Sequence, residues 1–181
     1  MNKKIFTVFA LFILIASISA ASAFDLGSIF GFGGNETVTI KGIDFNIPAG
    51  FEEFVTNSTK QYNRTVEGIA YFSTIKNYDD NNDSISISVS KNPSHKATQA
   101  TAKAVGGESE TINGIDGYLE YHPKNVTQFT SGKYIYTITI PPYYTFSYAQ
   151  DDKLVVVTTT DKSYLSEVLI EPSSSLFSFK F

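Results

Sequence analysis

The chain has 181 residues, a formal net charge of -4, 18% charged residues and no cysteine. The acidic balance argues against a nucleic-acid binder, and the missing thiols exclude a disulfide framework, a thiolate metal site and a cysteine nucleophile. A domain of this size buries about 70% of the surface that its unfolded chain exposes, so it forms a core without covalent staples.

The N-terminal residues differ in kind from the rest of the chain. Lys3 and Lys4 precede an uncharged apolar run over residues 5–18, and the small residues 21–23 (Ala-Ser-Ala) follow it. This order predicts a signal peptide over residues 1–23, cleaved before Phe24, and therefore export. The alternative is an uncleaved anchor, because a spanning helix needs about 20 apolar residues and the uncharged stretch nearly reaches that length.

A glycine-rich apolar linker is expected over residues 24–36, followed by one domain over residues 37–172. Within the domain, short runs of β-branched and aromatic residues alternate with clusters of Gly, Asn, Asp and Pro, a pattern typical of antiparallel strands. The expected strands cover residues 37–41, 44–47, 69–75, 84–90, 109–112, 118–121, 133–140, 146–148 and 154–159.

Two of these runs also predict which of their faces are buried. In residues 84–90 Ile or Val alternates with Ser, so the serine face is expected to meet water. Residues 154–157 (Leu-Val-Val-Val) are apolar on both faces, so this strand is expected at the centre of the sheet.

Two helices are expected. The first covers residues 96–105, with Ser94 as its N-cap, and the second starts at Asp161 as N-cap and ends at Pro172. The predicted fold class is α+β: an antiparallel β-sheet of about seven to nine strands with two short helices packed on one face. Residues 173–181 are expected to form a C-terminal tail or an edge strand.

Two phrases share an I-x-G-I-D pattern, at residues 40–44 and 112–116. The second contains Asn113-Gly114, the strongest short-range hairpin signal, because both residues tolerate positive φ. Reuse of one turn chemistry explains the pattern better than duplication, since the segments that follow the two phrases diverge.

No catalytic, cofactor-binding or metal-binding residue is predicted. His95 and His122 are the only histidines, and each is interpreted as a solvated residue rather than a ligand or general base. Asp79, Asn81 and Asp83 alternate like the start of a calcium loop, but the glycine and the glutamate that such a loop needs are missing, so a polar hairpin turn is preferred.

Five asparagines stand in the N-x-Ser/Thr pattern of N-glycosylation acceptors. They are Asn35, Asn57, Asn63, Asn82 and Asn125. The alternative is that they are ordinary polar loop residues, since glycosylation depends on the host.

Several phrases carry a resemblance. The leader ending in Ala-Ser-Ala, the following FDLGSIFGFGG, the phrases GIDFNIPAGF (residues 42–51) and INGIDGY (residues 112–118), and the hairpin over residues 146–157 resemble small exported α+β proteins of methanogenic archaea. The resemblance implies an extracytoplasmic location and N-glycosylation at the sequons, and it implies no catalytic residue.

The leading hypothesis is a non-enzymatic secreted or cell-surface domain that binds a cell-wall component, a glycan or a protein. Tyr143 and Tyr144, after two prolines, are the candidate partner-binding aromatics, whereas Tyr134 and Tyr136 share a strand face and are expected in the core. The protein is expected to be a monomer, without cofactors, nucleic acid or, after cleavage, a membrane. The alternative is an exported hydrolase with an Asp/Glu pair in a cleft.

Overall fold

The computed structural model describes residues 35–54, 62–131 and 134–171. The predicted signal peptide, the linker up to residue 34, the sequon at Asn57 and the C-terminal segment 173–181 lie outside these residues.

Strands dominate the described chain, and they are joined by short turns. The strands are β1 Glu36–Ile40, β2 Ile43–Ile47, β3 Glu52–Glu53, β4 Tyr62–Val66, β5 Ile69–Asp79, β6 Ser84–Lys91, β7 Glu108–Ile112, β8 Ile115–His122, β9 Asn125–Ser131, β10 Tyr134–Ile140, β11 Tyr143–Gln150 and β12 Lys153–Thr159. The helices are α1 Gln99–Lys103 and α2 Ser163–Val168.

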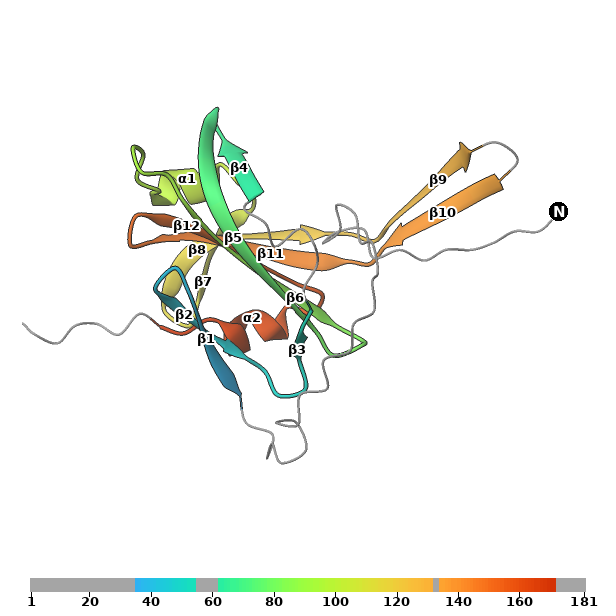
Figure 1. Ribbon diagram of the computed structural model, residues 1–181, viewed down its shortest axis with the longest axis horizontal. Helices are drawn as coiled ribbons and strands as arrows, with labels where there is room; N and C mark the ends of the chain where they lie inside the picture. Colours follow the sequence, from blue (N-terminus) through green and yellow to red (C-terminus); the bar gives the residue numbers. More distant parts are fainter. Residues whose placement is uncertain (1–34, 55–61, 132–133, 172–181) are drawn as a thin grey trace, which may run out of the picture.

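An eight-stranded antiparallel sheet forms the body of the molecule. Its order is β3-β5-β6-β12-β11-β8-β7, and β4 pairs with the outer edge of β5. Two further hairpins, β1-β2 and β9-β10, form two-stranded sheets of their own. The predicted α+β class, with an antiparallel sheet of this size and two short helices, is confirmed (Figure 1).

The central position of β12 is also confirmed. It pairs with β6 on one edge and β11 on the other, and Leu154, Val155, Val156 and Val157 are all buried. Because both faces of this strand are covered, it can be apolar throughout.

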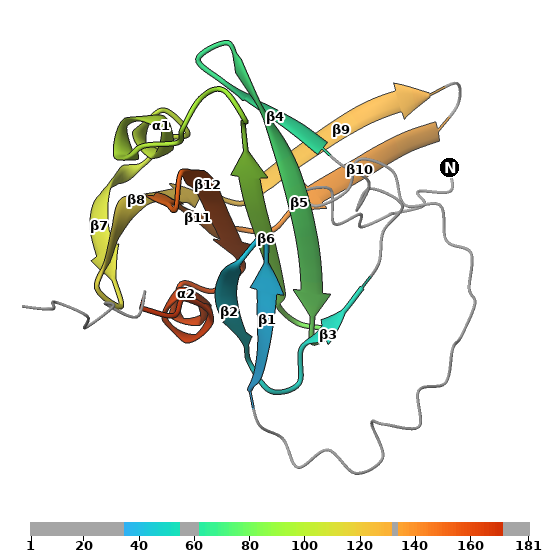
Figure 2. The same cartoon turned by 60° about the vertical axis from the view of Figure 1, so that its left-hand side comes forward.

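The helices do not pack on one face of the sheet, and this part of the prediction is wrong. Val155 belongs to a large core that includes Leu165 of α2, whereas Val156 belongs to a smaller core that includes Ala102 of α1. Successive side chains of a strand point to opposite faces. The two helices therefore cover opposite faces of β12, as Figure 2 also shows.

The hairpin β1-β2 lies on the α2 side and completes the large core. Val38, Ile40, Ile43, Phe45 and Ile47 all point into that core, and a β-bridge joins Phe45 to Leu169 at the end of α2. The protein thus has three layers: α1, the main sheet, and a third layer of α2 with β1-β2 (Figure 1).

The serine face of β6 is buried, contrary to the sequence prediction. Ser84, Ser86, Ser88 and Ser90 are each less than one-tenth exposed. This face carries the smaller core, and the Oγ atoms of Ser73 and Ser90 pair there at 2.6 Å. The Ser73–Ser90 pair satisfies two buried hydroxyls, and serine is small enough to be accommodated in a packed face, so the alternation of Ile and Ser did not indicate a solvent-exposed face.

The caps of the helices also differ from the prediction. Thr98, not Ser94, caps α1: it forms a capping box with Thr101, and the helix starts only at Gln99. Asp161 accepts hydrogen bonds from the backbone N–H and the hydroxyl of Ser163 at the start of α2, although Lys162 occupies the N-cap position. The second helix ends at Val168, before Pro172.

Both I-x-G-I-D phrases form the same tight turn. Lys41-Gly42 and Asn113-Gly114 all have positive φ, and in each hairpin the preceding Thr donates a hydrogen bond to the following Asp at 2.6 Å. The interpretation as one reused turn chemistry agrees with this geometry. The side chain of Asn113 also donates to the carbonyl oxygens of Ser166 and Leu169, and so fixes the β7-β8 turn to α2.

Candidate functional site

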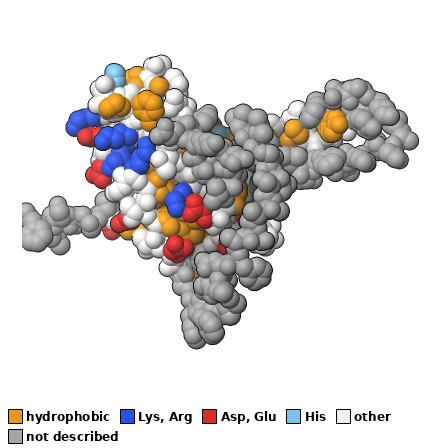
Figure 3. All heavy atoms as spheres, in the orientation of Figure 1, with side chains coloured by type: hydrophobic (Ala, Val, Ile, Leu, Met, Phe, Trp, Pro, Cys, Tyr) orange, Lys and Arg blue, Asp and Glu red, His pale blue; other side chains and the backbone are white. Residues whose placement is uncertain are grey.

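The hairpin β9-β10 extends away from the main sheet as a two-stranded ribbon (Figure 1). It continues the pairing of β8 with β11: His122 lies opposite Tyr143, and the ladder resumes with Asn125 opposite Ile140. No residue of β9 or β10 is charged. Figure 3 shows hydrophobic and uncharged side chains on the described part of the ribbon.

Prolines explain the break between sheet and ribbon. Pro123 lies in one of the two connecting segments, and Pro141 and Pro142 form the other. Because proline has no N–H to donate, the ladder cannot run through these positions. The ladder is interrupted between these two pairs, and the side chains that flank the interruption line a hollow.

Two aromatic pairs stand at this break, on opposite faces of the two strands. The rings of His122 and Tyr143 stack, with centroids 4.1 Å apart and planes at 9°. Tyr121 and Tyr144 form a tilted pair with centroids 5.0 Å apart. Aromatic pairs of this kind contribute about 0.5–1.5 kcal/mol beyond the area that they bury. Each pair therefore helps to hold its face of the ribbon base.

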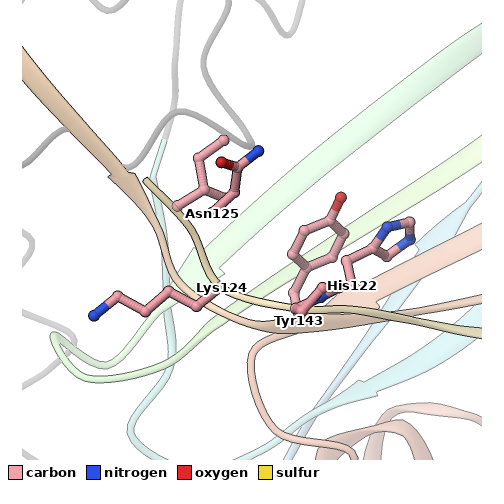
Figure 4. A pocket seen from close by; sticks show the side chains of 6 residues that line it. His122, Lys124, Asn125 and Tyr143 are labelled. Atoms are coloured by element: carbon pink, nitrogen blue, oxygen red, sulfur yellow. The ribbon is translucent and has the colours of Figure 1, made fainter. Parts of the chain in front are cut away.

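The His122–Tyr143 pair lines a pocket of about 260 Å³. Its other lining residues are Pro123, Lys124, Asn125 and Ile140. Figure 4 shows the rings of His122 and Tyr143 side by side and Asn125 separated from them by a gap, while Lys124 extends away from the rings. We call this hollow the ribbon-base pocket.

The carboxylate of Glu120 lies near both aromatic residues of the pocket. Nε2 of His122 lies 3.5 Å from Oε2 of Glu120. Burial, and then the charge of Glu120, raises the pKa of Tyr143. Like any tyrosine with a pKa at or above its usual value, it is protonated at neutral pH and can donate a hydrogen bond. The rings of Tyr143 and His122 thus form an apolar wall of the pocket. The Tyr143 hydroxyl and the Asn125 amide add polar groups to its lining.

A second hollow, of about 480 Å³, lies between the β7-β8 hairpin and α2. Lys162 forms an ion pair with Glu110 there, with Nζ and Oε1 2.7 Å apart, and the Asn113 amide is already bonded to α2. Its polar groups are thus largely occupied by one another. Neither hollow is lined by a pair of carboxylates, which is the feature that an Asp/Glu hydrolase site requires.

The aspartates of the β5-β6 turn also have internal partners. Oδ1 of Asp80 accepts hydrogen bonds from the backbone N–H groups of Asn82 and Asp83, which holds the pKa of Asp80 below its usual value. Asp83 accepts a hydrogen bond from the hydroxyl of Thr160. The described residues contain no group of three or more His, Asp or Glu side chains placed to hold a metal ion.

The predicted site residues have different positions. Tyr143 lies in the ribbon-base pocket, and Tyr144 points to the opposite face and packs against the large core. Tyr136 lies in the ribbon and belongs to neither core, so its predicted core position is wrong. His122 was predicted to be a solvated residue, and no role was predicted for Tyr121. Strand β9 was not predicted, because its residues show only a weak alternation of apolar and polar side chains. Without β9, nothing in the sequence indicated the ribbon or the pocket at its base.

The four sequon asparagines among the described residues, Asn35, Asn63, Asn82 and Asn125, are all exposed. Oδ1 of Asn35 accepts a hydrogen bond from the backbone N–H of Ala49. Asn63 lies in β4, Asn82 in the β5-β6 turn, and Asn125 begins β9. Asn125 alone of the four lines the ribbon-base pocket.

Comparisons with protein-family models, with curated proteins and with solved structures find no match to this chain. Among the residues that the structure describes, no helix has the length and apolar character needed to cross a bilayer.

Proposed function

We propose that the protein is an exported, non-enzymatic domain of the cell surface or the secreted fraction that binds a carbohydrate of the cell wall through its ribbon-base pocket. The observation that carries the proposal is the stacked pair of His122 and Tyr143 in the wall of a pocket whose rim holds the Asn125 amide. A sugar ring has apolar C–H faces and a hydroxylated edge. An aromatic wall with a few polar groups matches that pattern.

The size of the pocket supports a small ligand unit. Small-molecule sites usually measure about 300–1,000 Å³, so a pocket of about 260 Å³ suits one sugar unit of a longer chain rather than a large cofactor. The uncharged ribbon beside it offers an extended surface for the rest of that chain. Export, which the N-terminal pattern predicts, would bring the domain to such a polymer.

The test is binding of the chain, produced without N-linked glycosylation, to insoluble wall polysaccharide from its host. The variants are Tyr143→Ala and, as matched control, Tyr121→Ala, which removes an exposed tyrosine from the opposite face of the same strands. Binding should fall at least tenfold in Tyr143→Ala and change less than twofold in Tyr121→Ala. Equal loss in both, or no binding by the wild type, would refute the proposal.

A further inference from the structure

Asn125 combines two features that no other described sequon combines. It is an exposed acceptor asparagine followed by Val126 and Thr127, and it lines the same pocket as Tyr143 (Figure 4). We infer that a glycan attached to Asn125 folds back into the ribbon-base pocket and closes it, so that modification and binding of an external sugar exclude each other. The second half of this inference rests on the proposed function.

The position of Asn125 favours both the attachment of a glycan and the contact of that glycan with the pocket. Asn125 is the first residue of β9 and pairs with Ile140, the last residue of β10. The ladder therefore restrains the backbone after Asn125, and Pro123 restrains the backbone before it. A sugar bonded to Nδ2 starts at the pocket rim. The Tyr143 ring lines the same pocket and is the apolar surface that this sugar would contact.

The pocket offers that first sugar a better environment than water. The ring of Tyr143 and the side chain of Ile140 provide apolar contact, and the Tyr143 hydroxyl, which is neutral at physiological pH like that of any ordinary tyrosine, provides a hydrogen-bond donor. The attached sugar also loses little translational freedom, because the covalent bond holds it at the site at high effective concentration. An attached glycan thus competes well against a free one.

The chemistry is the ordinary transfer from a lipid-linked oligosaccharide diphosphate. A bond forms between Nδ2 of Asn125 and the anomeric carbon, while the bond from that carbon to the diphosphate oxygen breaks. The transferase of the host removes one proton from Nδ2, and the lipid diphosphate leaves. No oxidant or reductant is needed.

The other described sequons provide the contrast. Asn82 lies in the β5-β6 turn, where its backbone N–H donates to Asp80, and it lines neither described hollow. A glycan on Asn82 is expected to extend into solvent. It serves as the matched control, because both positions are exposed and both carry an N-x-Ser/Thr pattern.

The experiment uses the full chain expressed in a host with N-linked glycosylation. Site occupancy is mapped by mass spectrometry, and contacts between sugar protons and the Tyr143 ring are measured as nuclear Overhauser effects. Thr127→Ala removes the Asn125 sequon and keeps the asparagine, Asn82→Gln removes the control sequon, and Tyr143→Ala removes the ring. These readouts need no external ligand, so they remain decisive if the proposed function fails.

We expect occupancy at Asn125, sugar contacts with Tyr143, and a melting temperature that falls by a few degrees in Thr127→Ala but not in Asn82→Gln. Tyr143→Ala should remove the sugar contacts without changing occupancy. The unmodified protein should bind wall polysaccharide at least tenfold more tightly than the form modified at Asn125. An unmodified Asn125, a glycan without contacts to Tyr143, or equal polysaccharide binding by both forms when the unmodified form binds would overturn the inference. Absence of binding by the unmodified form would refute the proposed function instead.

Discussion

Ser147 donates a hydrogen bond from its Oγ atom to the backbone carbonyl oxygen of Ala102, at a distance of 3.0 Å. Ser147 lies in β11 and is buried, and Ala102 is the buried residue of α1. This bond joins the short first helix to the sheet on the face opposite α2. A five-residue helix has little stability of its own, so α1 depends on such tertiary contacts.

The first prediction compares two serines that flank Val156 on the same face of the sheet, Ser147 in β11 and Ser88 in β6. Ser147→Ala should lower the free energy of unfolding by about 1 kcal/mol, because a buried hydrogen bond is lost. Ser88→Ala should leave it unchanged or raise it, because Oγ of Ser88 is buried and has no hydrogen-bond partner among the described residues. Urea unfolding measures both; equal losses would show that the hydrogen bond to α1 does not matter.

The second prediction concerns the central strand. Val156→Asp should unfold the domain, because an unpaired buried carboxylate costs several kcal/mol against a total stability of about 5–15 kcal/mol. The control is Val126→Asp, the same substitution at a side chain of β9 that is 51% exposed. Circular dichroism melting should show a cooperative transition in the control only. A Val156→Asp protein that melts near the wild-type temperature would contradict the position of β12.

The third prediction is an alkaline loss of stability that involves Tyr78. Burial, and then the charges of Glu53 and Glu36, raises the pKa of Tyr78 far above its usual value near 10. Above about pH 10 the unfolded chain loses this proton and the folded chain retains it, so stability falls as the pH rises. Below about pH 10 the group contributes no slope.

Tyr78→Phe isolates this effect. The Tyr78 hydroxyl is buried without a hydrogen-bond partner among the described residues, so the variant should be as stable as the wild type at pH 8, or more stable by about 1 kcal/mol. Its advantage should grow between pH 10 and pH 11.5, measured by urea unfolding at each pH. A constant difference across that range would show that Tyr78 titrates normally in the folded state.

Much of the fold was predictable from local patterns. Strand alternation, the Asn113-Gly114 turn and the doubly apolar run Leu154–Val157 each act over a few residues, and the structure contains the strands and the turn that they predict. The side on which α1 packs was not predictable, because it depends on Ser147 and Ala102, which are 45 residues apart. The burial of Ser90 likewise depends on Ser73 of the neighbouring strand.

Only part of the candidate site could be predicted from the sequence. Tyr143 was selected because it follows two prolines, and it does line the pocket. His122 was set aside as a solvated strand end, since nothing in its own neighbourhood indicates that it stacks on a ring 21 positions later. The stack exists because β8 and β11 pair in a register that places the two residues opposite each other. Register is a property of the assembled sheet.

The claim that the ribbon-base pocket is the recognition site is tested most directly by a nuclear magnetic resonance titration. Soluble fragments of the host wall polysaccharide are added to the isotope-labelled, unglycosylated full chain, and the backbone amide shifts are followed. We expect the largest changes at His122, Lys124, Asn125 and Tyr143, and we expect Tyr143→Ala to abolish them. Changes confined to the hollow beside Glu110 and Lys162, or no saturable change at all, would contradict it.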